Sequence, residues 1–103
     1  MEVIKKGSIE PIMVALRDRL GNVLDLSGVT SGQFDVRRKR DNAVCQANVA
    51  WTYDVDFPMT AVCLIDTTQA NYTAGDEFKL YLKYTAGSEL PVKGPIFFRV
   101  EDD

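Results

Sequence analysis

Hydrophobic and polar residues alternate along most of this chain, with the period of two that is typical of a β-strand with one buried face. The clearest case lies in residues 78–84, where four apolar residues alternate with two lysines and a tyrosine. Similar alternation predicts strands within residues 8–17, 33–37, 45–51 and 96–100. A continuous apolar run at 62–65 predicts a more deeply buried strand. The chain is therefore expected to contain six or more strands.

The alternation also assigns side chains to the buried face of each strand. In residues 8–17 this face carries Ile12, Val14 and Leu16, and in residues 45–51 it carries Cys45, Ala47, Val49 and Trp51. Phe34 and Val36 occupy it in residues 33–37, and Ile96, Phe98 and Val100 occupy it in residues 96–100.

Turn-forming residues separate these segments, and glycine, asparagine and aspartate dominate them. The expected turns and loops lie at 18–22, 27–32, 41–42, 74–76 and 86–88, and Gly94-Pro95 is expected to open the last strand. One helical turn is expected at 66–71, with Asp66 as its N-cap. The pattern predicts a single all-β domain over residues 1–103, an antiparallel β-sandwich of about 6–8 strands. Residues 1–7 are expected to form an N-terminal arm, and residues 101–103 a flexible tail.

Composition narrows the class of function. The chain has 103 residues and a formal net charge of −3, whereas nucleic-acid-binding domains usually carry a basic excess. It has no apolar run of the ~18–20 residues that span a bilayer, and no apolar segment follows Lys5 and Lys6 to form a signal peptide. We therefore expect no nucleic-acid partner, no membrane partner and synthesis in the cytoplasm. Cys45 and Cys63 are expected to be buried thiols, although a disulfide would form if their strands paired.

The sequence offers little for catalysis. It contains no histidine, which is the usual general base near neutral pH and the commonest metal ligand. Its glycines are scattered among the turns rather than gathered in a phosphate-binding loop, and no Gly-x-Ser-x-Gly motif is present. Asp54 and Asp56 could share a face and bind a cation, but solvated surface carboxylates explain them more simply. We therefore predict that the chain is not an enzyme and holds no cofactor and no metal.

The candidate partner contacts are basic and aromatic. The cluster Arg37-Arg38-Lys39-Arg40 is the densest charge feature, and it suits a contact with an acidic partner or simply a solvated strand end. Tyr81 and Phe97 fall on the polar faces of their strands, where aromatic residues mark interfaces or a second packed face. The candidate contact residues are Arg37, Arg38, Arg40, Tyr81 and Phe97.

Several phrases resemble the small immunoglobulin-like modules of tailed bacteriophages, and in particular the N-terminal domain of the BppU family of baseplate proteins. They are the opening Ile4–Ser8 strand lead, the Asp18-x-x-Gly21 and Asp25-Leu-Ser-Gly28 turns, the Phe34–Arg38 strand, the Gly75-Asp76-Glu77-Phe78 lead and the closing Pro95–Val100 strand.

This resemblance implies an immunoglobulin-like fold and a structural or assembly role in the capsid, neck, tail or baseplate of a virion. The implied partners are other virion proteins, met in multiple copies within a symmetric particle. The alternative is a carbohydrate-binding module, in which Trp51, Tyr53 and Tyr72 would form an exposed aromatic platform.

Overall fold

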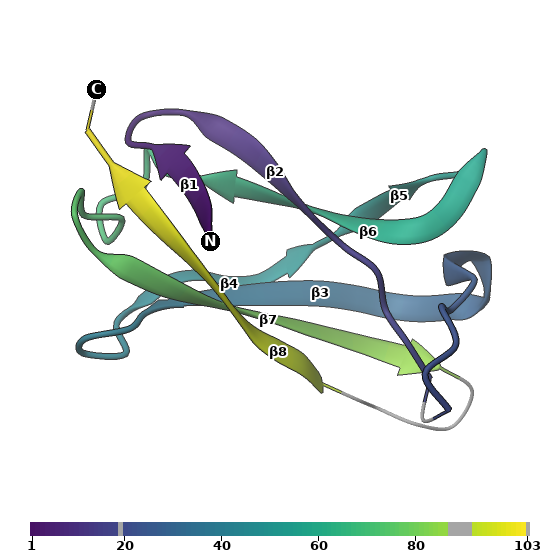
Figure 1. Ribbon diagram of the computed structural model, residues 1–103. Coiled ribbons are helices and arrows are strands. Elements are labelled where there is room, and N and C mark those ends of the chain that lie inside the picture. The colour runs from purple at the N-terminus through teal and green to yellow at the C-terminus, as the bar shows by residue number, and fades with distance from the viewer. Residues whose placement is uncertain (19, 87–91, 103) are drawn as a thin grey trace.

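The computed structural model describes residues 1–18, 20–86 and 92–102, and it folds them into two β-sheets packed face to face (Figure 1). One sheet has five strands in the order β1-β8-β7-β3-β4, and the other has three in the order β2-β6-β5. The strands are β1 (Glu2–Lys5), β2 (Ile9–Val14), β3 (Val29–Arg38), β4 (Val44–Ala50), β5 (Thr52–Asp54), β6 (Phe57–Asp66), β7 (Glu77–Ala86) and β8 (Val92–Glu101). The all-β sandwich expected from the alternation is thus confirmed.

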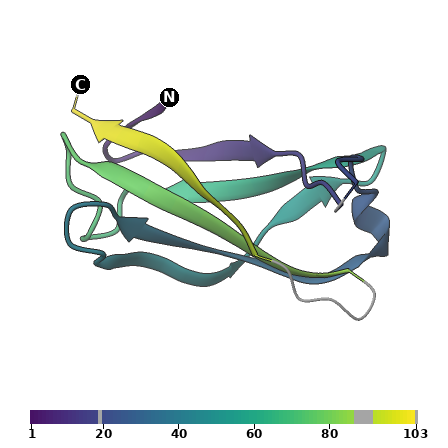
Figure 2. The same ribbon diagram turned by 60° about the horizontal axis from the view of Figure 1, so that its bottom comes forward.

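Neighbouring strands are antiparallel, except that β1 runs parallel to β8. The two layers are seen separately in Figure 2. The described residues include one short 3-10 helix, η1 (Leu26–Gly28), which Asp25 caps by accepting a hydrogen bond from the Ser27 backbone. Residues 67–71 form turns rather than the expected helical turn, and Asp66 ends β6 with its carboxylate accepting hydrogen bonds from Thr68. No helix in the described part of the chain is long and apolar enough to cross a membrane.

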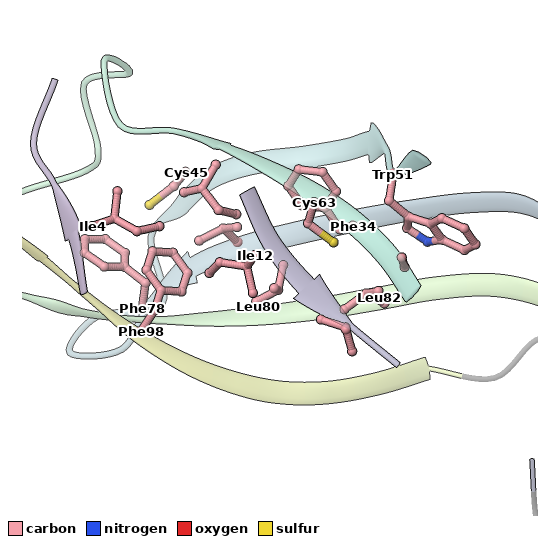
Figure 3. Close-up of a cluster of buried hydrophobic side chains, with 14 of the residues drawn as sticks. Ile4, Ile12, Phe34, Cys45, Trp51, Cys63, Phe78, Leu80, Leu82 and Phe98 are labelled. Atoms are coloured by element: carbon pink, nitrogen blue, oxygen red, sulfur yellow. The ribbon is translucent and has the colours of Figure 1, made fainter. Parts of the chain in front are cut away.

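The core lies between the sheets and follows the expected faces of most strands (Figure 3). The five-stranded sheet contributes the buried residues Phe34, Val36, Phe78, Leu80, Leu82, Tyr84, Phe98 and Val100, and the three-stranded sheet contributes Ile12, Val14, Ala61, Cys63 and Ile65. Phe78 packs on Phe98 with ring centroids 5.5 Å apart, and Tyr72 lies 5.1 Å from Phe78. Aromatic pairs at these distances add to the stabilisation that burial provides.

The N-terminal segment is not a free arm, as the sequence led us to expect. Glu2–Lys5 form β1, and Ile4 is only 1% exposed because it packs into the core. The Lys6 backbone continues the pairing by donating to Glu101 O at 2.7 Å. Buried Thr67 then holds the following turn, because its hydroxyl accepts hydrogen bonds from the backbone of Gly7 and Ser8. At the other end, Glu101 closes β8, and Asp103 of the expected tail lies outside the described residues.

Strand β4 departs from the expected alternation. Gln46 is buried and Ala47 is exposed, because the pairing of β3 with β4 shifts register and Asn48 takes a left-handed φ of 54°. The Gln46 amide reaches across to β6, where it donates to Leu64 O at 3.3 Å and accepts from Asp66 N at 3.1 Å. It also accepts from the Tyr72 hydroxyl. One side chain thus satisfies polar groups along an edge of β6 that has no neighbouring strand there.

The boundaries of two other strands differ from expectation. Strand β3 begins at Val29 and runs through the expected 27–32 loop. A Cβ on Gly32 would lie 2.3 Å from ring atoms of Trp51, so glycine is what allows the buried indole to pack against this strand. Gly94-Pro95 lies inside β8 instead of opening it. The expected 86–88 turn falls mostly outside the described residues.

Candidate docking surfaces

Three of the five predicted contact residues lie together on the outer face of the five-stranded sheet. Arg37, Tyr81 and Phe97 alternate with core residues of β3, β7 and β8, and Phe97 is 39% exposed. The strand register adds Lys79, which sits directly between Arg37 and Phe97, and Lys83, which lies further along β7. We call Arg37, Lys79, Tyr81, Lys83 and Phe97 the basic face.

The basic face contains a shallow groove, which is lined by Asp35, Arg37, Asn42, Lys79, Tyr81, Lys83 and Val92. Its carboxylate, Asp35, forms an ion pair with Lys83 at 3.0 Å and accepts from Asn48 N at 2.7 Å. Partial burial alone would raise the pKa of Asp35, but these two partners hold the pKa below its ordinary value. The groove therefore carries one ionised carboxylate among three cations.

The other two predicted contacts, Arg38 and Arg40, differ from each other in exposure and in their ion pairs. The Arg38 guanidinium donates to both oxygens of Asp41, at 2.9 and 2.8 Å, and to Thr73 Oγ1 at 3.2 Å. With only 12% of its side chain exposed, Arg38 fastens the β3–β4 turn to the β6–β7 loop and is not available to a partner. Its hydrogen bonds also lower the pKa of Asp41 to about 2. Arg40 pairs with Asp76 at 2.9 Å but stays 58% exposed, so a partner contact by Arg40 remains a prediction.

The aromatic platform of the carbohydrate-binding alternative does not form. Trp51 is 7% exposed and Tyr72 is fully buried, because both side chains fill the core at the two ends of β4. Tyr53 is half-buried against the same core. An indole or phenol ring inside the core cannot stack on a sugar, so the expectation was wrong for Trp51 and Tyr72, whereas sugar binding by Tyr53 stays a prediction.

The other polar and reactive side chains also have plain structural surroundings. Asp54 accepts a hydrogen bond from Asp56 N in the exposed β5–β6 turn. Within the described residues, no three histidine, cysteine, aspartate or glutamate side chains gather as a metal ion requires. Cys45 and Cys63 are free thiols inside the core (Figure 3). Burial raises the pKa of Cys45 to about 11 and that of Cys63 to about 12, so both thiols stay protonated at neutral pH.

The outer face of β2 and β6 was not identified from the sequence, and it is apolar. Ile9, Met13 and Leu64 are 59%, 66% and 50% exposed, and they alternate with buried residues of β2 and β6. Pro11 lies opposite Leu64, and half-buried Val62 lies opposite Met13, so the five side chains form one continuous patch. We call Ile9, Pro11, Met13, Val62 and Leu64 the apolar face.

The apolar face differs from the usual outer face of a sheet. An antiparallel sheet with one face on the core normally presents polar side chains to water on the other. Among the outward-facing residues of β2 and β6, all of which are described, only Asp66 is charged. A continuous exposed apolar patch of this kind marks an interaction surface.

A signal for this face was present in the sequence. Residues 62–65 are all apolar, and residues 9–14 are apolar on both faces, with Glu10 as the one exception. In a sandwich of two sheets only one face of each sheet is covered, so a strand that is apolar on both faces must expose one of them. Leu64 shows this directly, because the expected deep burial of the 62–65 run does not extend to it.

The chain has no significant match among protein-family models, curated proteins or solved structures.

Proposed function

We propose that this protein is a structural module of a tailed bacteriophage virion, which docks onto other virion proteins through its apolar face. Docking requires a surface rather than a reaction centre, and the β-sandwich offers an apolar outer face on β2 and β6. The apolar face is the observation that carries the proposal, because water-exposed Ile9, Met13 and Leu64 contribute little to the isolated fold.

The strand arrangement supports the immunoglobulin-like part of the proposal. In variable-type immunoglobulin domains, one sheet contains the consecutive neighbours G, F, C and C′, and the facing sheet contains B, E and D. The order β8-β7-β3-β4 opposite β2-β6-β5 corresponds to this scheme when the strands are lettered along the chain. This correspondence agrees with the resemblance of the sequence to phage immunoglobulin-like modules.

Apolar burial would supply the affinity for the partner. A fully buried Leu, Ile or Met side chain contributes about 1.5–3 kcal/mol, and the exposed parts of Ile9, Met13 and Leu64 retain half or more of that gain for a partner. Repetition in a symmetric particle would add avidity, because each copy meets an equivalent neighbour. Neither step needs a cofactor.

The test is whether the protein is part of the particle. Particles from the phage that encodes the chain are purified by density gradient, and their proteins are quantified by mass spectrometry. The proposal predicts that the chain sediments with the particles in a fixed copy number and resists washing with high salt, because apolar contacts are not screened. A chain that is abundant in infected cells but absent from washed particles would contradict it.

A further inference from the structure

We propose that the basic face is a second binding site, whose ligand is an acidic segment of a protein with an apolar side chain beside its carboxylates. This site lies on the opposite sheet from the apolar face and does not depend on a role in a virion. Its central feature is one row of side chains across four strands.

The row runs across β8, β7, β3 and β4. The register places Phe97 opposite Lys79, Lys79 opposite Arg37, and Arg37 opposite Val44. Two cations thus stand side by side in the middle of the sheet, and two exposed apolar residues flank them, with Phe97 39% and Val44 45% exposed. Like charges directly opposite one another on a sheet are destabilising, so this arrangement does not serve the fold.

The two central cations are only partly balanced: Arg37 is attracted by the Asp35 carboxylate, which Lys83 already pairs. Lys79 donates to Asn42 Oδ1 at 2.9 Å, which is a neutral partner. Within the described residues, neither Lys79 nor Arg37 forms a salt bridge, whereas neighbouring Lys83 is paired with Asp35. A carboxylate supplied by a partner would relieve the repulsion between Arg37 and Lys79.

The apolar ends of the row indicate the rest of the ligand. Lys39 Nζ lies over the Phe97 ring at 5.3 Å from its centroid, and Phe97, opposite Lys79, stays 39% exposed. Tyr81 forms part of the groove wall next to this row. An acidic protein segment with an aromatic or aliphatic residue can meet both kinds of surface at once, with carboxylates on the cations and its apolar residue on Phe97.

The charge pattern favours a protein segment over nucleic acid. A phosphate backbone needs a continuous basic track, and the face interrupts its cations with Asp35 and Glu77. The whole chain is also acidic, with a formal net charge of −3. Long-range repulsion would therefore oppose a polyanion more strongly than a short acidic segment.

The test uses the full chain and two probes, a short glutamate peptide with one central phenylalanine and a single-stranded DNA oligonucleotide. Binding is measured by calorimetry and by NMR shifts at about 50 mM and about 300 mM salt, since exposed ion pairs weaken as the Debye length shortens. The peptide should bind at low salt, shift the amides of Arg37, Lys79 and Phe97, and bind less well at high salt. An absence of peptide binding, or tighter binding of the DNA to these residues, would overturn the proposal.

Two charge reversals separate the site from a general charge effect. Lys79→Glu should reduce peptide affinity by about tenfold or more, because the reversal repels the ligand carboxylates. The same change at Lys93, which is exposed but does not line the groove, is the matched control and should have a much smaller effect. Lys79→Glu should also keep a melting temperature at least equal to that of the unmodified protein, since it places a carboxylate opposite Arg37. If Lys79→Glu and the Lys93 control lost equal peptide affinity, the proposed site would be overturned.

Phe97→Ser tests the apolar part of the ligand. It should weaken the peptide that contains phenylalanine but not an all-glutamate peptide of the same length. A variant of the apolar face, Leu64→Lys, should bind both peptides normally, so failure of the virion proposal and failure of this one are distinguishable. Loss of peptide binding in Leu64→Lys would contradict the separation of the two surfaces.

Discussion

Replacing Met13 and Leu64 together by serine should weaken docking while the domain stays folded. The two side chains are 66% and 50% exposed, so half or more of each is in contact with water in the isolated protein and can be buried by a partner. Full burial of such a side chain is worth about 1.5–3 kcal/mol, and the exposed fractions scale the loss to about 2–3 kcal/mol for the pair. That loss corresponds to a decrease in affinity of roughly 30- to 150-fold. The parts of Met13 and Leu64 that are already buried in the fold scale in the same way to a decrease of about 1–2.5 kcal/mol in the free energy of unfolding.

The assay adds purified protein to particles from a phage whose gene for the chain carries a nonsense mutation, and it measures the bound fraction by sedimentation. Val55→Ser with Phe57→Ser is the matched control, because these residues are 79% and 63% exposed but lie in the β5–β6 hairpin, outside the apolar face. The control should bind as the unmodified protein does. The reasoning fails if the Met13 and Leu64 variant binds normally, or if the hairpin control loses as much affinity.

Three further predictions concern the fold. Gln46→Leu should destabilise the domain by about 2–5 kcal/mol in chemical denaturation, because it leaves three polar groups without their partner, and a loss below about 1 kcal/mol would contradict the bridging role. Asp41, whose pKa falls from 3.8 to about 2 beside Arg38, binds its proton less readily in the folded chain. The lowered pKa adds stability above about pH 4 that disappears as pH falls through about 2; Asp41→Asn should flatten the melting temperature in this range, and an unchanged slope would refute the linkage. At pH 8 a disulfide reagent should leave Cys45 and Cys63 unmodified until denaturant is added, because their pKa values are raised to about 11 and about 12, and rapid reaction of the native protein would disprove their protection.

Alternation predicted the sandwich well because burial in a sheet is a local rule. Phe78, Leu80 and Leu82 point into the core as their spacing requires, and the turn at Asp41-Asn42 lies where turn chemistry places it. The rule fails where a contact with a residue distant in the sequence determines whether a segment forms a strand. Residues 2–5 contain too few apolar positions to indicate a strand, and they become β1 only because β8 provides an edge for pairing.

The candidate surfaces were only partly predictable for a related reason. Tyr81 and Phe97 were identified from their polar-face positions and Arg37 from its basic cluster, but their grouping depends on the register of β3, β7 and β8. Arg38 belongs to the same basic cluster, yet its guanidinium donates hydrogen bonds to Asp41 and Thr73 and so connects a turn and a loop within the fold. Charge density in a sequence therefore identifies cations, whereas ion pairing in the fold determines which of them remain available.

The most direct test of the docking account is a photo-cross-linking measurement inside assembled particles. A photoreactive amino acid replaces Met13 on the apolar face, and in a second variant it replaces Lys93, which is exposed on the other sheet. After irradiation, the cross-linked proteins of purified particles are identified by mass spectrometry. The account predicts that position 13 forms an efficient cross-link to another virion protein, at one defined location. The account would be contradicted if the protein entered particles but position 13 formed no cross-link to a neighbouring protein.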